Sequence, residues 1–178
     1  YLSMGRKLPA DPDLPRKLGE GRVADVRPCI YCYTCVSAIY TRERSRCAVN
    51  PEVGFEYQRA NLPKPVRRKR VAVVGGGPGG MEAARRLALD GHEVVLFERG
   101  ERLGGTLRFA SIAYQPNERL LDWLEAQLGA SAVEVRLNTA ATADLLKQWK
   151  ADDVVVATGA RRSMPPIPGA DLAHVYSG

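Results

Sequence analysis

The stretch Val71-Ala72-Val73-Val74-Gly75-Gly76-Gly77-Pro78-Gly79-Gly80 decides the fold class of this sequence. Its first four residues are all apolar and predict a short buried strand. Residues 78–90 then predict a helix, because apolar side chains recur on one face, and residues 94–97 predict a second buried strand. A strand, a helix and a strand in this order form a βαβ unit, so the sequence predicts an α/β domain with a parallel sheet.

Glycines fill the turn between the first strand and the helix. Gly75, Gly77 and Gly80 fit the pattern G-x-G-x-x-G, with Gly79 beside the last of them. Such a loop gives a tight turn, a bare backbone that a pyrophosphate can approach, and a helix N-terminus whose N–H groups face the anion. Glu98 follows the second strand, where a carboxylate can accept from a ribose hydroxyl. The alternative for the glycine stretch is a turn that binds no ligand, and the alternative for Glu98 is a merely solvated carboxylate. The glycine loop between a strand and a helix, combined with an acidic residue after the second strand, favours a Rossmann-like dinucleotide site.

Two later stretches support a dinucleotide. Gly104, Gly105 and Thr106 follow the second strand, and Ala157-Thr158-Gly159 ends a last strand predicted over residues 154–158. Either stretch could be an ordinary turn. In this order, together with the glycine loop, they resemble the FAD-binding flavoproteins that have two dinucleotide domains. In that family the first glycine loop of the chain holds the flavin, so the resemblance implies FAD rather than NAD here.

Three further elements complete the predicted α/β domain. Asn117 is expected to cap a helix that Gly129 ends. Residues 133–137 predict a strand, and residues 142–150 predict a short helix.

The first 65 residues have a different pattern. Residues 1–4 are typical of an apolar strand that enters a turn at Gly5 and Arg6, so we expect the chain to begin in mid-structure. A short helix is predicted between residues 11 and 19, where an Asp and two prolines can start it and a glycine can end it. From residue 22 to residue 65 no helical or strand period persists. Something other than a hydrophobic core is therefore expected to order this stretch.

Four cysteines lie in that stretch, and they predict a metal centre. Cys29, Cys32 and Cys35 fall within seven residues, and Cys47 follows after eleven others. Structural zinc usually takes two separated pairs of ligands, whereas three closely spaced cysteines and a remote fourth suit a [4Fe–4S] cluster. We favour the cluster, with zinc as the alternative. Nearby arginines would offset the charge of a thiolate-ligated cluster or are simply solvated: Arg27, Arg42, Arg44 and Arg46.

The charge distribution restricts the possible partners. The 178 residues carry a net charge of +6, but residues 1–70 hold 15 Lys and Arg against 7 Asp and Glu, and the remainder is slightly acidic. The basic run 67–70 and the cysteines could indicate a zinc-containing nucleic-acid module, yet no aromatic interleaving or recognition motif accompanies them. No apolar run approaches the length of a membrane span and no signal-peptide pattern is present, so we expect a cytoplasmic protein without a membrane partner.

The order of these pieces resembles one family, the 2,4-dienoyl-CoA reductase and trimethylamine dehydrogenase branch of the old yellow enzyme superfamily of NADH:flavin oxidoreductases. In that family a TIM barrel with FMN precedes a four-cysteine [4Fe–4S] segment and an FAD domain, into which an NAD(P)H domain is inserted. The resemblance implies a barrel tail over residues 1–22, a cluster segment over 23–66, and the first part of the FAD domain over 67–178, cut before the NAD(P)H domain. The chain is then an internal fragment.

The resemblance also implies site residues. Gly5 and Arg6 would contact the FMN phosphate, and the four cysteines would ligate the cluster. The FAD contacts would come from the two glycine-rich stretches, from Glu98 and the end of the last strand, and from the backbone of Ala141: Gly75, Gly77, Gly79, Gly80, Glu98, Gly104, Gly105, Thr106, Ala141, Ala157, Thr158 and Gly159. Three features depart from the family pattern: a two-residue second cysteine gap, Gly79 in place of Ala, and Thr106 in place of Gln.

The implied activity is that of an enzyme that passes electrons from NAD(P)H through FAD and the cluster to FMN and an enoyl-type substrate. An amine dehydrogenase, with the path reversed, and an electron-transfer flavoprotein without its own substrate are the alternatives. No cysteine follows Cys47, so the FAD domain cannot act as a Cys-x-x-Cys disulfide enzyme. We expect no catalytic residue in this chain, because the substrate face would belong to the barrel.

Overall fold

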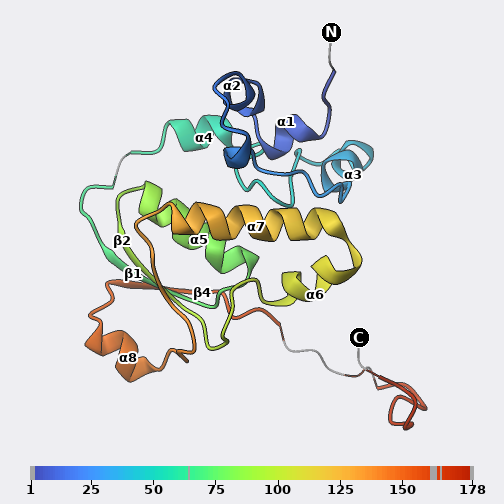
Figure 1. The fold of residues 1–178 in the computed structure, drawn as a ribbon, viewed down its shortest axis with the longest axis vertical. Helices are drawn as coiled ribbons and strands as arrows, with labels where there is room; N and C mark the ends of the chain where they lie inside the picture. Colours follow the sequence, from blue (N-terminus) through green and yellow to red (C-terminus); the bar gives the residue numbers. More distant parts are fainter. Residues whose placement is uncertain (1–2, 64, 161–163, 165, 177–178) are drawn as a thin grey trace.

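A four-stranded parallel sheet is the centre of the computed structural model, which describes residues 3–63, 65–160, 164 and 166–176 (Figure 1). The strands are β1 (Arg70–Val74), β2 (Glu93–Phe97), β3 (Glu134–Arg136) and β4 (Asp153–Val156), and their order in the sheet is β3-β2-β1-β4. Every neighbouring pair is parallel. This arrangement confirms the predicted α/β class and the βαβ unit.

Alternate strand residues face opposite sides of the sheet, as the two-residue period of a strand requires. Val73, Val94 and Leu96 pack against α5 (Pro78–Leu89) and α7 (Gln115–Gly129) on one face. On the other face, Val95 and Phe97 pack against α8 (Ala143–Gln148) and the tryptophan that follows it. Because helices cover both faces of the central strands, β1 and β2 are apolar from Val71 and Val94 onward rather than alternating.

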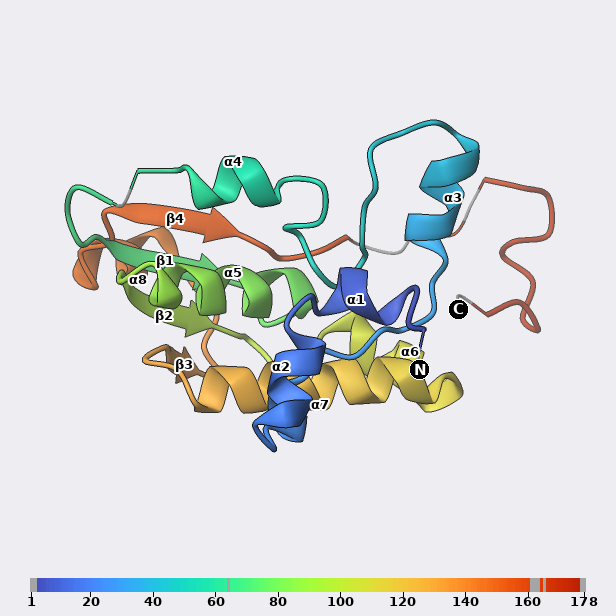
Figure 2. The ribbon, with the colours of Figure 1, turned by 90° about the horizontal axis from the view of Figure 1, so that it is seen from above.

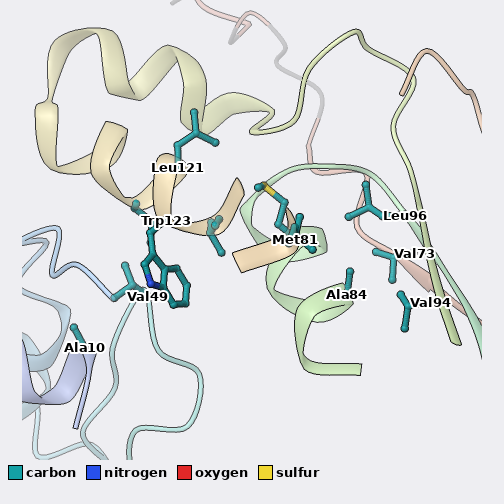
Figure 3. Close-up of a cluster of buried hydrophobic side chains, with 12 residues drawn as sticks. Ala10, Val49, Val73, Met81, Ala84, Val94, Leu96, Leu121 and Trp123 are labelled. Carbon is teal, nitrogen blue, oxygen red and sulfur yellow. The ribbon is translucent and has the colours of Figure 1, made fainter. Parts of the chain in front are cut away.

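The N-terminal part of the chain packs on the same core as α5 and α7. Its elements are α1 (Lys7–Ala10), α2 (Leu14–Gly19), a 3₁₀ turn at Val23–Asp25, α3 (Thr34–Tyr40) and α4 (Glu56–Ala60). Ala10 and Val49 belong to the buried cluster that also contains Met81 and Trp123 (Figure 3). Seen from above, α1 and α2 lie beside α7, and α4 lies on the side of α5 (Figure 2). Residues 3–60 and the sheet domain therefore share one hydrophobic core.

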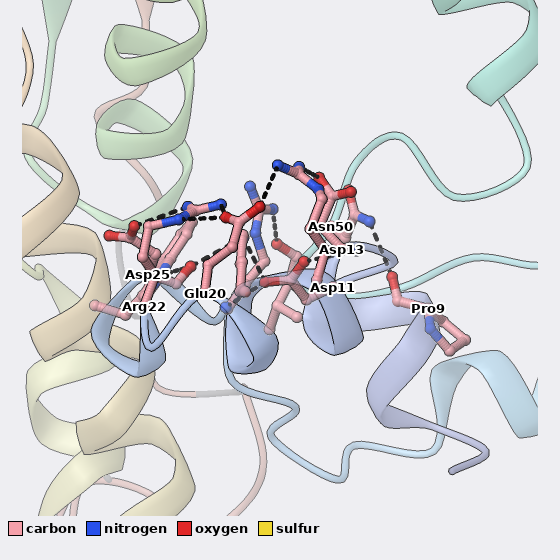
Figure 4. A network of polar contacts seen from close by, with 12 residues as sticks. Pro9, Asp11, Asp13, Glu20, Arg22, Asp25 and Asn50 are labelled. Carbon is pink, nitrogen blue, oxygen red and sulfur yellow. Dashed lines mark hydrogen bonds and ion pairs between the residues drawn. The ribbon is translucent and has the colours of Figure 1, made fainter. Parts of the chain in front are cut away.

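Buried polar contacts fix the path of this N-terminal part (Figure 4). Asp11 is 4% exposed and accepts from Lys17 Nζ at 2.6 Å and from the backbone N–H of Arg27 at 2.8 Å. Asn50 donates to the carbonyl oxygen of Pro9 at 2.9 Å. These bonds connect α1 and α2 to the residues on both sides of the cysteines, so polar contacts contribute to the order that the sequence could not explain.

Residues 22–63 have no persistent period, as the sequence predicted, but a 3₁₀ turn, α3 and α4 form there, each too short to display one. Two other expectations about the elements were wrong. Ser3 and Met4 belong to no strand, whereas residues 1–2 lie outside the described residues. A helix that the sequence did not reveal, α6 (Thr106–Ala113), precedes α7.

The start of α7 and the end of β4 also differ from the prediction. Helix α7 begins at Gln115 with Tyr114 as its N-cap, because Pro116 suits the first helical turn, and Asn117 therefore lies inside the helix. The last strand ends at Val156 instead of residue 158. None of the described helices combines the length and the apolar character that a membrane-crossing helix needs.

Candidate functional site

The glycine loop lies between β1 and α5, and two of its glycines cannot carry a side chain. Gly75 has a φ of +111°, and a Cβ there would lie 2.4 Å from the carbonyl oxygen of Ala157. A Cβ on Gly80 would lie 1.9 Å from the carbonyl oxygen of Gly75. These two glycines let β1, α5 and the end of β4 approach one another closely, which is the packing that a dinucleotide-binding turn needs.

Gly77 and Gly79 meet a different requirement. A Cβ at either position would have no atom within 4 Å, so the space in front of the loop is open. Gly77 is the N-cap of the 12-residue helix α5, and no side chain caps that end. The free N–H groups and the positive end of the helix dipole therefore face open space, which is the environment that a pyrophosphate prefers.

Glu98 ties the end of β2 to this loop. Its carboxylate accepts from the backbone N–H of Gly76 at 2.6 Å and from that of Gly100 at 2.8 Å. The sequence predicted a contact to a ribose for Glu98, with a merely solvated carboxylate as the alternative; in the structure the carboxylate holds the glycine loop in shape. A carboxylate has about four lone-pair positions, so acceptor capacity remains for a ligand hydroxyl.

The second glycine-rich stretch lies on the first. Gly104 donates its N–H to the carbonyl oxygen of Gly76 at 2.7 Å, and a Cβ on Gly105 would lie 3.2 Å from Cα of Gly77. Gly104 has a φ of +105° and leaves no room for a side chain, because Leu121 Cδ1 would lie 2.8 Å from its Cβ. Thr106 begins helix α6 directly afterwards. The two stretches therefore lie against each other and make up one candidate site.

The end of β4 closes the site from the other side. The N–H of Ala157 donates to the carbonyl oxygen of Val74 at 2.8 Å, and Gly159 has a φ of +72° with open space around it. Thr158 lies between them and is exposed. Ala141 instead packs, half-buried, on the second core cluster beside α8. A ligand role for any of these residues remains a prediction.

The cysteines lie on the side of α5 and α7. All four thiols are free, and Cys29 and Cys47 pack against the main core cluster. Among the described residues, no three Cys, His, Asp or Glu side chains are arranged to hold one metal ion. A [4Fe–4S] cluster does not require such convergence, because its four irons take one thiolate each at separate corners. The donor set of four thiols therefore fits a cluster chemically.

The environments of two of these thiols differ. Burial raises the pKa of the Cys32 thiol, but hydrogen bonds from the hydroxyl and N–H of Thr34 and from the N–H of Ala48 outweigh it and hold that pKa below its ordinary value. Burial raises the pKa of Cys47, and the nearby Cys32 and Cys29 raise it further, although two backbone N–H groups oppose this. Cys47 thus lies within electrostatic reach of Cys29 and Cys32.

Arg6 contacts the cysteine loop rather than standing apart from it. Its guanidinium lies 5.1 Å from the ring centroid of Tyr31 and 4.5 Å from that of Tyr33, the two residues on either side of Cys32. Gly5 is exposed with open space around it. Sequence reasoning missed the tyrosines, although the alternation of Cys with Tyr was a visible signal.

Arg27 joins the cysteine segment to the predicted FAD domain. Its guanidinium forms an ion pair with Glu82 of α5 at 2.9 Å, donates to the carbonyl oxygen of Val49 and lies 4.6 Å from the ring centroid of Trp123. Desolvation lowers the pKa of Arg27. Burial raises the pKa of Glu82, but the hydrogen bond from Arg85 and the charge of Arg27 outweigh it and keep the pKa below its ordinary value. The charge of Arg27 is thus compensated by Glu82 instead of being available to a cluster.

The other arginines of this segment are largely solvated. Arg46 pairs with Glu43 at the surface, and Arg44 lies over Phe55 at 4.5 Å from the ring centroid. Arg42 is exposed and has a φ of 52°. These positions fit the alternative in which the arginines serve as solvated surface groups.

A cavity of about 460 Å³ separates the cysteine segment from the glycine loop. Cys47 and Val49 line it on one side, and Pro78 and Gly79 at the start of α5 line it on the other. The predicted metal site and the predicted dinucleotide site are therefore neighbours in space, although Cys47 and Gly75 are far apart in the sequence.

Several known proteins resemble this chain in sequence. Residues 69–177 match the family model of the pyridine nucleotide-disulphide oxidoreductases. The chain is 40% identical to bilirubin reductase of Mediterraneibacter gnavus over 178 residues, which cover 98% of this chain and 28% of that protein.

Solved structures match over the same span. A 2-naphthoyl-CoA reductase superposes with a TM-score of 0.86 at 36% identity, covering 96% of this chain and 26% of the other. Histamine dehydrogenase from Rhizobium sp. 4-9 superposes with a TM-score of 0.85 at 32% identity, covering 93% and 25%. The chain thus spans between a quarter and three tenths of the length of these relatives. It belongs to the pyridine nucleotide-disulphide oxidoreductase family.

Proposed function

We propose that this chain is the cofactor-bearing middle of a longer NAD(P)H-dependent flavin and iron–sulfur oxidoreductase. The observation that carries the proposal is the close approach of two sites: the cysteine segment is joined to α5 by the Arg27–Glu82 ion pair, and α5 begins in the glycine loop. Electron transfer between two bound cofactors requires that they be held near each other. A shared core and a buried ion pair provide such a rigid arrangement.

FAD would occupy the glycine loop. The open N-terminus of α5 at Gly77 and Gly79 would receive the pyrophosphate, and Glu98 would receive the ribose hydroxyls. Gly104, Gly105 and Thr106 would cover the same ligand from α6. The small residues at the end of β4, Ala157 to Gly159, would leave room for the rest of the flavin, and Ala141 would contribute a backbone contact to the adenine.

A [4Fe–4S] cluster would be held by Cys29, Cys32, Cys35 and Cys47. Hydrogen bonds that stabilise the thiolate of Cys32 suit a metal ligand, because the thiolate is the form that binds. When bound, the cluster supplies one-electron transfer between the flavins. Zinc is the alternative occupant of the same four thiols.

FMN would belong mainly to a barrel upstream, of which residues 1–22 would be the tail. Gly5 and Arg6 would hold its phosphate. With this assignment the cysteine segment covers residues 23–66 and the FAD domain begins at residue 67. A reducing cytoplasm suits four free thiols, so we place the protein in that compartment.

The substrate of the whole protein would be an enoyl-type small molecule, and its reduction would be the overall reaction. The similarity to 2-naphthoyl-CoA reductase and to bilirubin reductase supports a reductase. The similarity to histamine dehydrogenase favours a second candidate, the oxidation of an amine with electrons flowing in the opposite direction. In either case the substrate-binding groups would lie outside this chain.

Analysis of the full-length protein, purified without oxygen, tests this proposal. We expect about four irons and four acid-labile sulfides per chain, together with FAD and FMN. Zinc without sulfide, or an absence of FAD, would refute it. FAD and cluster without FMN would favour an electron-transfer flavoprotein. Consumption of NAD(P)H that depends on an enoyl thioester, compared with flavin bleaching by an amine, separates the two substrate classes.

A further inference from the structure

Two strained tyrosines flank Cys32. Tyr31 has a φ of 54° and Tyr33 a φ of 60°, which places both in the left-handed region of the backbone. Aromatic residues seldom adopt this conformation, and they keep it only where surrounding contacts fix it. The contact that both rings share is the Arg6 guanidinium, at 5.1 and 4.5 Å from their centroids.

The rings leave the hydrogen-bonding capacity of Arg6 unused. A cation–π contact places the guanidinium over the face of an aromatic ring and gives its five N–H donors no oxygen or nitrogen acceptor. Nη1 of Arg6 is buried and has no acceptor among the described residues. An arginine that is held by two aromatic rings and has an unpaired buried donor is suited to an oxyanion, which guanidinium binds with two parallel hydrogen bonds.

We propose that Tyr31 and Tyr33 form a clamp that presents Arg6 to a phosphate monoester and ties that anion to the loop of Cys32. The inference rests on the proposed function, in which the phosphate is that of FMN. The tyrosines are positioning residues, because they act through Arg6. The strain on both sides of Cys32 then has a role: it turns both rings toward one guanidinium, so that the flavin phosphate and the cluster-bearing loop are held together.

The test compares FMN with riboflavin, which lacks the phosphate, on the deflavinated full-length protein. Quenching of flavin fluorescence gives the dissociation constant of each ligand. Tyr33→Gly removes the ring and also relaxes the backbone, whereas Tyr33→Phe keeps the ring. Tyr31→Gly removes the other side of the clamp. Tyr40→Ala, at an 84% exposed position of α3, is the matched control.

We expect Tyr33→Gly to raise the dissociation constant of FMN about three- to tenfold, which is the range of a partly desolvated cation–π contact, and to leave riboflavin unchanged. Tyr31→Gly should act in the same direction, whereas Tyr33→Phe and Tyr40→Ala should bind both ligands like the wild type. Unchanged FMN affinity in both glycine variants would overturn the clamp. Equal losses for FMN and riboflavin would also overturn it, because they indicate general damage to the site. A wild-type protein that carries no FMN as purified would instead contradict the proposed function, before any variant is made.

Discussion

Arg27 Nη2 lies 2.9 Å from Glu82 Oε1, and their side chains are only 9% and 16% exposed. The two residues are 55 positions apart, one before the cysteines and the other in the helix that follows the glycine loop. Arg85 also donates to Glu82, at 2.8 and 2.9 Å, so the carboxylate is shared by two arginines. This buried ion pair is one polar connection between the two predicted cofactor sites.

Loss of the Glu82 carboxylate is expected to be costly. Glu82→Ala leaves Arg27 charged and uncompensated in a buried position, and such a change destabilises proteins by about 3–5 kcal/mol. Urea unfolding of the purified protein measures the loss. Glu43→Ala is the matched control, because Glu43 pairs with Arg46 at the surface and should change stability by less than about 1 kcal/mol. Equal effects of both substitutions would contradict a special role for the buried pair.

Stability should also depend on pH through Glu82. Its pKa is lower in the folded protein than in the unfolded chain, so its contribution is complete above about pH 4.3, the ordinary value for Glu. The contribution is lost as the pH falls from there through the lower, folded value. We therefore expect the stability difference between the wild type and Glu82→Gln to be constant above about pH 5 and to shrink below about pH 4. A difference that grows with acidity would contradict the assignment.

Gly80→Ala should disrupt the glycine loop. Its Cβ would lie 1.9 Å from the carbonyl oxygen of Gly75, and overpacking of this kind costs about 1–3 kcal/mol or more. We expect loss of bound FAD as well, read from the flavin absorbance per protein. Gly129→Ala, where a Cβ would have no atom within 4 Å, should keep its flavin and be at least as stable as the wild type. If Gly80→Ala retained its FAD, the close approach of α5 to the carbonyl oxygen of Gly75 would be excluded.

Glu98→Gln should weaken FAD binding without unfolding the protein. The carboxylate of Glu98 accepts one hydrogen bond on each oxygen, from Gly76 and from Gly100. In the glutamine side chain an NH₂ group replaces one of these oxygens and cannot accept, and the other oxygen is no longer charged. Hydrogen bonds to a charged group contribute about 1.5–3 kcal/mol to stability. We expect about a tenfold or larger increase in the dissociation constant of FAD, measured by titration of the apoprotein. Glu101→Gln, at an exposed position beside Arg102, serves as the control and should bind FAD normally. If Glu98→Gln and Glu101→Gln bound FAD with equal affinity, Glu98 would be a solvated carboxylate that does not contribute to FAD binding.

The sequence predicts the sheet domain well because the signals there are local. The apolar runs that begin at Val71 and Val94, and the glycines between them, can each be recognised from a few neighbouring residues. The steric reasons found for Gly75 and Gly80 are those that the glycine pattern implies. Helix α6 was not predicted from the sequence. Its apolar residues Phe109 and Ile112 are exposed, so they do not form the buried apolar face by which a helix is recognised.

The N-terminal part is less predictable because its order is non-local. Helices of four to seven residues carry no clear period, and the bonds that fix them join distant positions such as Asp11 with Arg27, or Pro9 with Asn50. The partner of Arg27 could not be inferred from neighbouring residues. The left-handed conformation of Tyr31 and Tyr33 runs against residue preference and needs the tertiary contact with Arg6 to account for it.

An anaerobic titration of the full-length protein with NADH, followed by flavin absorbance and by electron paramagnetic resonance, tests the central claim most directly. We expect the wild type to show flavin bleaching together with the signal of a reduced iron–sulfur cluster. Cys47→Ala should lose the iron–sulfur signal while its flavin is still reduced, because Cys47 would be a cluster ligand that lies beside the start of α5. A wild-type protein without that signal, or a Cys47→Ala protein that retains it at full intensity, would contradict the account.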